Sequence, residues 1–301
     1  MRKATSRTGA RVILKTIVDS NERRFLQYLG GIKERSNHTI PLLDVIDLSI
    51  GKTIIVLPWK SPLDKVLECR DRPDDVVSLC LQFVEGVAFL HQHKVAHCDL
   101  KPGNVVVDTI SESETLPRLF IIDFDLAQYV ESEETMTEGW CGTPPWMAPE
   151  LGSRDGPIQR YSPILADRWA CGRMVKHFAK YFPTYEGVRN TRLLAFAQRL
   201  LDVNPRARPA LNELQAIHGS RKRKSARSRH EPLLKRHAVC LSSKFDLVIV
   251  PYWAPGTRTA VFQLVDRIPG GSCVRQSSGT RESVNALFID DAYDDGRGAR
   301  I

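Results

Sequence analysis

The most constraining feature of this chain is a group of polar side chains on one Pro/Gly loop. The stretch VAHCDLKPGNVVVD, residues 95–108, places Asp99, Lys101 and Asn104 between an apolar helical pattern and a β-branched run. A carboxylate can take a proton from a hydroxyl, an ammonium can neutralise phosphate oxygens, and an amide oxygen can hold Mg²⁺. The group therefore suits chemistry on a phosphate, provided that its members act together.

A further acidic position follows this loop. Asp123 comes directly after an apolar strand in LFIIDFDLA, so the strand would aim the carboxylate out of the end of a sheet, at a metal position. Any one of these polar residues alone is more often part of a solvated turn. The pattern H-x-D-L-K-x-x-N followed by D-F-x, from His97 to Phe124, is much more specific because it fixes the residue type at seven positions.

Hydrophobic periodicity divides the chain into a small strand-rich part and a larger helical part. A β-branched run predicts a strand over 11–18, and two apolar strands around Gly51 and Lys52 predict a hairpin over 41–59. The other expected elements are helices at 19–32, 74–93, 163–181, 191–203 and 209–217, and strands at 105–108 and 118–122. This order favours an α+β chain with polar loops at the join.

Composition excludes several classes of protein. No apolar run approaches the ~18–20 residues that a bilayer-spanning helix needs. No apolar core follows the basic N-terminus MRKATSRTGA, so no secretory signal is readable. The seven cysteines contain no C-x-x-C pair, which favours a reducing intracellular compartment over a disulfide framework or a zinc cluster.

The net charge of +8 is concentrated in one segment. Residues 221–237, RKRKSARSRHEPLLKRH, hold eight Lys and Arg against one acid and supply +7 of that charge. The rest of the chain is close to neutral, so binding of nucleic acid by its body is not expected. The clusters RKRK and KRH leave two interpretations open, a nuclear address recognised by an importin and a solvated basic tail.

The character of the chain changes after Gly219. Residues 242–266, SSKFDLVIVPYWAPGTRTAVFQLVD, can form two strands, but the sequence identifies no partner for them. The Gly/Ser/Asp-rich end is typical of disorder. Residues 218–301 are therefore predicted to be a largely disordered extension outside the main domain.

Five segments in this order resemble the eukaryotic protein kinase family. HCDLKPGN looks like its catalytic loop and DFD (123–125) like its metal-binding D-F-G. GTPPWMAPE (142–150), DRWACG (167–172) and LLDVNPRARPALNEL (200–214) look like the end of its activation segment, the start of its central helix and its closing helical element. YSPILADRWACG is also similar to small kinase-like proteins of mushroom-forming fungi.

The resemblance covers about residues 11–217 and implies both a fold and an activity. The fold would be a two-lobed, protein-kinase-like α+β domain over residues 1–217. A truncated N-terminal lobe of about three strands and one helix would cover about 11–60, and a mainly helical C-terminal lobe about 61–217. The implied activity is ATP-dependent phosphoryl transfer to Ser or Thr hydroxyls of a protein substrate, with ATP and Mg as cofactors.

The family's catalytic roles carry over by position. Asp99 would accept or orient the proton of the substrate hydroxyl, and Lys101, which is typical of Ser/Thr kinases, would steady the transferring phosphoryl group. Thr143 would lie beside Asp99 and shape the site for a Ser or Thr acceptor. Asn104 and Asp123 would hold two Mg²⁺.

The family's nucleotide-binding roles also have matches. Lys15 would pair the α- and β-phosphates, with Glu22 as its helix partner, and a solvated strand lysine is the alternative. IIVLPWKS (54–61) would hold adenine. Leu57 would guard the back of the pocket, Pro58 would contribute a carbonyl, and Lys60 would contribute an N–H. The alternative is an ordinary strand end.

Three supporting residues complete the resemblance. Glu150 and Arg208 match a buried ion pair that links the activation segment to the late helices. Asp167 matches the residue that accepts hydrogen bonds from the backbone of the catalytic loop. His97 is expected to pack in the core against Phe124, not to act as a base.

Three departures from the family pattern leave the activity open. Only fourteen residues precede Lys15, with a single glycine, so the Gly-rich loop that covers ATP is not found. Cys98 stands where many kinases have an Arg that pairs with a phosphorylated activation loop, so switching by loop phosphorylation is not expected. Asp125 replaces the Gly of D-F-G, where it can bind metal or face solvent. The alternative to an active kinase is a catalytically impaired kinase-fold scaffold, or pseudokinase.

Overall fold

The computed structural model describes most of residues 1–214 and two strands nearer the C-terminus. The described residues are 1–6, 9–18, 21–48, 52–69, 73–108, 117–182, 187–214, 247–253 and 260–266. They fall into two compact units. One unit holds residues 1–17, 43–59 and the two C-terminal strands, and the other holds residues 18–42 and the described residues from 60 to 214.

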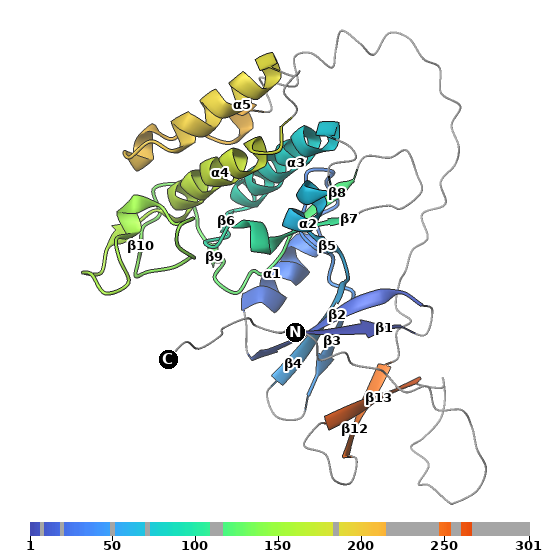
Figure 1. The fold of residues 1–301 in the computed structure, drawn as a ribbon. Helices are drawn as coiled ribbons and strands as arrows, with labels where there is room; N and C mark the ends of the chain where they lie inside the picture. The colour runs from blue at the N-terminus through green and yellow to red at the C-terminus, as the bar shows by residue number, and fades with distance from the viewer. Residues whose placement is uncertain are drawn as a thin grey trace, which may run out of the picture. The chain divides into compact units, whose positions relative to one another are not determined.

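The first unit contains a four-stranded sheet in the order β1-β2-β4-β3 (Figure 1). Its strands are β1 (Arg2–Thr5), β2 (Arg11–Val18), β3 (Asp44–Asp47) and β4 (Lys52–Pro58). β3 and β4 pair antiparallel from Asp44 opposite Val56 to Asp47 opposite Thr53, which confirms the hairpin expected over 41–59. Residues 54–57 of β4 are all buried, as their continuous apolar run indicates.

The fourth strand corrects the expectation of about three. β1 pairs antiparallel with β2, with Arg2 opposite Leu14 and Thr5 opposite Arg11. Next to the paired residues, the Ser6 N–H donates to the Ala10 carbonyl at 2.8 Å, and Gly9 adopts a φ of +81° that glycine tolerates well. The strand RKAT has no alternating apolar pattern, so pairing with β2 defines it, not its own side chains.

The two strands expected within 242–266 are present and pair with each other. β12 (Leu247–Trp253) runs antiparallel to β13 (Ala260–Asp266), with Leu247 opposite Asp266 and Trp253 opposite Ala260. The partner that the sequence did not identify is therefore the neighbouring strand. The remainder of the predicted extension, including the basic segment 221–237, lies outside the described residues.

Three long helices lie side by side in the second unit, with α4 (Pro163–Ala179) between α3 (Pro73–Gln92) and α5 (Gly187–Leu200) (Figure 1). Pro163 stands in the first turn of α4, and the Ser162 hydroxyl caps the helix by accepting from the Leu165 N–H. Gly172 lets α4 approach α5 closely, because a Cβ there would lie 2.9 Å from Leu200 Cβ. No helix in the described parts of the chain is long and apolar enough to cross a bilayer.

Residues 18–42 belong to the second unit, which differs from the expected lobe boundary near residue 60. They contain α1 (Asn21–Gly30) and a segment that pairs with β8 (Arg118–Ile121). The Ile40 N–H donates to the Ile121 carbonyl at 3.1 Å, and the Ile121 N–H donates to the His38 carbonyl at 2.7 Å. β8 itself continues a three-stranded sheet in the order β5-β7-β8, formed with β5 (Ser61–Pro62) and β7 (Val105–Asp108).

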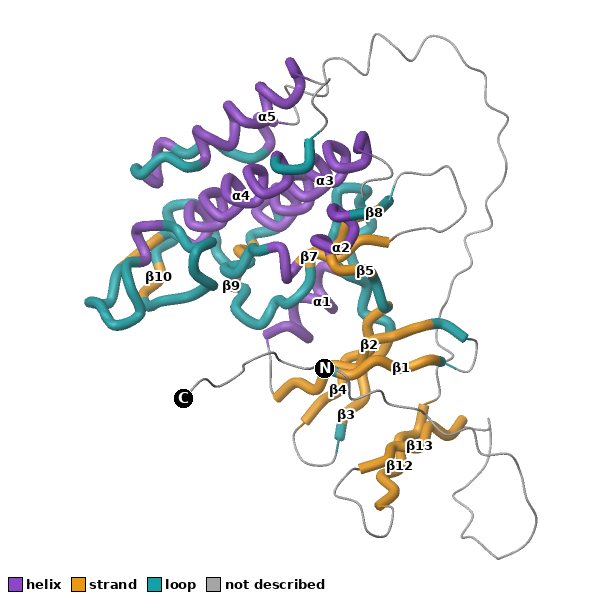
Figure 2. The backbone as a smooth tube through the Cα atoms, viewed as in Figure 1, coloured by secondary structure: helices purple, strands orange, loops and turns teal. Residues whose placement is uncertain are grey.

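Short elements hold a loop-rich segment between residues 123 and 162 (Figure 2). β6 (Val95–Ala96) pairs with β9 (Gln128–Tyr129), and β10 (Thr137–Glu138) pairs with β11 (Arg160–Tyr161). The remaining elements are the helix α2 (Leu63–Glu68) and the 3₁₀ turns η1 (Pro102–Asn104), η2 (Pro149–Leu151) and η3 (Pro205–Ala207). Of the helix expected at 209–217, residues 212–214 are helical and the rest lies outside the described residues.

Candidate active site

The carboxylate of Asp99 is the centre of a polar cluster on the loop between β6 and β7. Its side chain is only 9% exposed. Lys101 Nζ donates to Asp99 Oδ2 at 2.7 Å, and the hydroxyl of Thr143 donates to Asp99 Oδ1 at 2.8 Å. Asn104 Nδ2 donates to the Asp99 carbonyl at 2.8 Å and to Oδ2 at 3.1 Å. The structure thus brings together Asp99, Lys101, Asn104 and Thr143, as the sequence pattern predicts.

Lys101 connects the two halves of this cluster. Its ammonium also donates to Thr143 Oγ1 at 2.8 Å, so one cation contacts both the loop carboxylate and a hydroxyl that is far along the chain. η1 turns the backbone between Lys101 and Asn104, with Pro102 in its first turn. The result is a base, a cation and a hydroxyl within hydrogen-bonding distance of one another, which is the geometry that proton transfer from an acceptor alcohol requires.

Asp167 on α4 fixes the backbone of the same loop. Its Oδ2 accepts from the His97 N–H at 2.6 Å and its Oδ1 accepts from the Cys98 N–H at 2.9 Å. Cys98 is held at a φ of +64°, a left-handed conformation that non-glycine residues adopt rarely. These two hydrogen bonds to Asp167 help the loop keep a conformation that it would not adopt alone.

His97 is a packed residue, as the sequence indicates. It is fully buried, its ring centroid lies 4.9 Å from that of Phe124, and its Nε2 is 3.0 Å from the Ile122 carbonyl. Burial lowers the pKa of the imidazole, and the charge of Asp167 opposes this only in part. The neutral ring therefore packs as a spacer between the Asp99 loop, which carries His97, and the Asp123 loop, which carries Phe124.

Three carboxylates gather where β8 ends. Glu22 from α1, Asp123 and Asp125 each offer an oxygen, and these oxygens lie within 4.8 Å of one another. Glu22 is buried, Asp123 is partly buried at a φ of +69°, and Asp125 is exposed. Carboxylate oxygens are hard ligands, so this donor set fits Mg²⁺. Asp125 therefore lies within reach of the proposed metal position, whereas the sequence left metal binding and solvent exposure open.

Asn104 presents the second candidate metal ligand. Its amide nitrogen is committed to Asp99 by two hydrogen bonds. The side-chain oxygen is the atom that remains for a cation. Asn104 is 4% exposed, so a ligand formed by this oxygen would already be oriented by the surrounding loop.

The residues predicted to hold the nucleotide divide between the two units. Lys15 is half-buried on β2, Leu57 is buried on β4, and Pro58 ends β4, all in the first unit. Glu22 and Lys60 belong to the second unit. The ammonium of Lys60 lies 2.6 Å from Asp108 Oδ2, so its side chain is engaged on β7. A nucleotide-binding role for these five residues remains a prediction.

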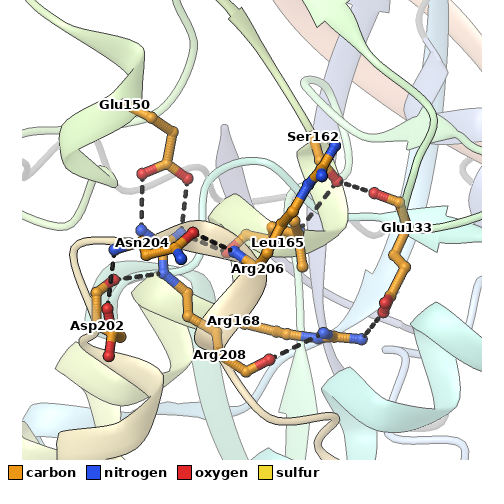
Figure 3. Close-up of polar contacts among 9 residues, drawn as sticks. All are labelled: Glu133, Glu150, Ser162, Leu165, Arg168, Asp202, Asn204, Arg206 and Arg208. Atoms are coloured by element: carbon orange, nitrogen blue, oxygen red, sulfur yellow. Dashed lines mark hydrogen bonds and ion pairs between the residues drawn. The ribbon is translucent and has the colours of Figure 1, made fainter.

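Two arginines anchor the segment that carries Thr143 (Figure 3). Arg208 binds both carboxylate oxygens of Glu150, as the sequence predicts. Arg168 on α4 binds the carboxylate of Glu133 and also donates to the Arg208 carbonyl at 3.1 Å. The Ser162 hydroxyl donates to the Glu133 carbonyl at 2.6 Å, so Glu133 is held through both its side chain and its backbone.

The Arg168–Glu133 pair was not foreseen in the sequence. Its only signal is an arginine next to Asp167 in DRWACG, and nothing marks Glu133 among the acids of ESEE. The pair places a permanent negative charge on the activation segment against a buried guanidinium. This is consistent with the expectation, drawn from Cys98, that the segment does not depend on phosphorylation for its anchoring.

The comparisons with known proteins agree with this geometry. Residues 60–200, which hold Asp99, Asp123, Thr143 and Asp167, match the family model of the protein kinase domain. Residues 60–200 therefore correspond to a protein kinase domain. The matched residues include both loops of the polar cluster and the anchoring helix α4.

Curated proteins that are similar to this chain carry the names of protein kinases. Serine/threonine-protein kinase 17A of Oryctolagus cuniculus is 40% identical over 98 residues, which cover 33% of this chain and 22% of that protein. A probable myosin light chain kinase of Dictyostelium discoideum is 30% identical over 153 residues, covering 48% and 38%. Serine/threonine-protein kinase dst3 of the same organism is 28% identical over 178 residues, covering 51% and 30%. The matched region therefore spans well under half of each of these relatives.

Proposed function

We propose that this kinase transfers the γ-phosphoryl group of Mg-ATP to Ser or Thr hydroxyls of a protein substrate. The observation that carries the proposal is the Asp99 carboxylate, which is nearly buried and held by Lys101, Asn104 and Thr143 at 2.7–3.1 Å. Phosphoryl transfer depends mainly on positioning and charge stabilisation, and this cluster supplies both.

Asp99 would orient the acceptor hydroxyl and receive its proton. An incoming Ser or Thr hydroxyl would take the place at Asp99 Oδ1 that Thr143 now occupies, and Thr143 would remain alongside as a neighbour of similar size and chemistry. Lys101, within 2.8 Å of both side chains, would place its charge beside the transferring phosphoryl group.

Asp123 and Asn104 would hold Mg²⁺, with Glu22 and Asp125 close to Asp123. Magnesium, when bound, neutralises charge on the phosphate oxygens of ATP. The chain's own contribution is to fix the ligands: Asn104 by its bonds to Asp99, and Asp123 by its place at the end of β8. Lys15, Leu57, Pro58 and Lys60 would bind the nucleotide, as their family positions suggest.

A phosphotransfer assay with the purified chain tests the proposal. Asp99→Asn and Asp123→Asn are expected to lower kcat by about 10²-fold or more, because each removes a charge that acts in the transition state. Asp155→Asn is the matched control, since Asp155 is exposed on a turn outside the cluster. Equal phosphotransfer rates for the wild type and Asp99→Asn would contradict the proposal.

A kinase-fold scaffold without turnover is the alternative function. The observation in its favour is the β1–β2 connection, where residues 6–10 contain one glycine and not the three of the family's G-x-G-x-x-G loop. A thermal-shift titration separates the two functions. A melting temperature that rises with Mg-ATP, in a chain that nonetheless shows no phosphotransfer, would favour the scaffold.

A further inference from the structure

Two cysteines meet directly beside the proposed catalytic residues. Cys98 precedes Asp99 on the catalytic loop, and Cys141 precedes Gly142 and Thr143 on the activation segment. Each thiol lies close enough to shift the pKa of the other, that of Cys98 upward and that of Cys141 downward. Cys141 also packs against the buried cluster that contains Cys98, Ala96, Val130 and Ile164. Two cysteines 43 positions apart in the sequence thus pack in one apolar cluster.

The backbones that carry the cysteines approach closely as well. A Cβ placed on Gly142, which has a φ of +97°, would lie 3.1 Å from the carbonyl oxygen of Cys98. Disulfides require Cα atoms within about 7 Å and Cβ vectors that converge. The contact of Gly142 with the Cys98 carbonyl shows that the two cysteine-bearing segments lie against each other, as such a bond needs.

The environment makes Cys141 the more reactive of the pair. The Tyr161 hydroxyl lies 2.9 Å from Cys141 Sγ. The neighbouring Cys98 thiol lowers the pKa of Cys141, and the bond to Tyr161 lowers it further, while burial opposes both. The contact with Cys141 raises the pKa of Cys98, and burial raises it further. Burial also raises the pKa of Tyr161, so its hydroxyl keeps its proton and can donate to the sulfur.

A small pocket gives access to this pair. It has a volume of about 20 Å³ and is lined by Cys98 and Cys141 together with Asp99 and Thr143. This volume holds a molecule the size of water and excludes a nucleotide or a peptide. Cys141 is partly exposed, whereas Cys98, Cys80 and Cys171 are buried. A small polar oxidant can therefore reach Cys141 before it reaches the buried thiols.

We propose that Cys98 and Cys141 form a disulfide when a hydroperoxide reacts at Cys141. The Cys141 thiolate attacks one peroxide oxygen, an S–O bond forms, the O–O bond breaks, and the alcohol or water leaves after taking a proton. Cys141 is then a sulfenic acid, oxidised by the two electrons that the peroxide gained. The Cys98 sulfur attacks the sulfenic sulfur, the S–S bond forms, and hydroxide leaves with the Cys98 proton as water. The crosslink ties the Asp99 loop to the Thr143 segment and is reversed by a dithiol.

Mass mapping of the full chain tests this modification without depending on kinase activity. The protein is treated with a series of hydrogen peroxide concentrations, alkylated, digested without reductant and analysed for crosslinked peptides. We expect the Cys98 and Cys141 peptides to appear joined, and to separate after treatment with dithiothreitol. In Cys98→Ser, the crosslink should be lost and dimedone should trap a sulfenic acid on Cys141.

Two further variants sharpen the test. Cys69→Ser removes an exposed thiol elsewhere and should leave the crosslink unchanged. Tyr161→Phe removes the hydrogen bond to Cys141 Sγ and should slow crosslinking several-fold. The proposal is overturned if Cys98 and Cys141 stay reduced in the wild type at peroxide doses that oxidise Cys69. It is also overturned if Cys141 forms its first crosslink with a different cysteine.

Discussion

The guanidinium of Arg208 binds the carboxylate of Glu150 through two parallel hydrogen bonds, of 2.6 Å from Nη1 to Oε1 and 2.8 Å from Nη2 to Oε2. The Arg208 side chain is completely buried, and it also donates to the carbonyls of Leu165 and Asp202. The pair therefore joins η2, the start of α4 and the chain around η3 in one fully hydrogen-bonded network (Figure 3).

Breaking this pair is expected to destabilise the kinase strongly. Arg208→Ala should lower the free energy of unfolding by about 3–5 kcal/mol, because it leaves the Glu150 carboxylate and two carbonyls without their donor. Denaturant unfolding measures this change. Arg199→Ala is the matched control, because the Arg199–Glu213 pair at 3.0 Å is exposed on both sides and should contribute about 1 kcal/mol or less. Equal losses in the two variants would contradict the buried network.

The close approach of Gly142 to the catalytic loop predicts a second difference. Gly142 and Gly139 both have positive φ, +97° and +115°, so alanine introduces backbone strain at either position. Only at Gly142 does the new Cβ meet other atoms, at 3.0 Å from Met147 and 3.1 Å from the Cys98 carbonyl. Gly142→Ala should therefore lower the free energy of unfolding by about 1 kcal/mol or more beyond Gly139→Ala. If denaturant melts give the same free energy of unfolding for the two variants, Gly142 does not lie as close to the catalytic loop as the structure has it.

Asp167 should control the dynamics of the catalytic loop. Asp167→Ala removes the acceptors of two buried backbone N–H groups, those of His97 and Cys98, at a cost of about 1–3 kcal/mol for each. Asp167→Asn keeps one acceptor oxygen and should have a smaller effect. Amide hydrogen exchange at His97 and Cys98 is the decisive measurement, and faster exchange confined to these amides is expected. Unchanged exchange in Asp167→Ala would mean that other contacts fix the loop.

Burial of neutral His97 predicts a pH dependence of stability. Burial lowers the pKa of His97 in the folded chain, whereas in the unfolded chain the pKa keeps its ordinary value near 6.5. Below about pH 6.5 the unfolded state therefore binds a proton on this imidazole that the folded state does not bind. Stability should therefore fall as the pH decreases from about 6.5, by up to about 1.4 kcal/mol per pH unit. His97→Gln has no imidazole to protonate, so its free energy of unfolding, measured by denaturant melts, should change less with pH between 7.5 and 5.5. Parallel profiles would assign the pH dependence to other groups.

The local elements could be predicted from the sequence because their signals are local. The β-branched run 11–18 became β2 with the same bounds, and the predicted starts of α3 and α4 agree with the structure within a residue. The strand β1 was missed because RKAT carries no alternating pattern, so only its pairing with β2 defines it. The grouping of residues 18–42 with the second unit has a similar origin, since their hydrogen bonds to Ile121 are not local in the sequence.

The order of motifs by itself determined the family and named Asp99, Lys101, Asn104, Asp123 and Thr143, because a chemistry that needs fixed residue types leaves them at fixed spacings. Only the tertiary structure decided which side chains meet. Glu133 reaches Arg168 and Cys141 reaches Cys98 across distances in the chain that no local pattern records. Those contacts depend on how the activation segment folds back on the helices. That path is set by the packing of the whole domain, so no single stretch of sequence encodes it.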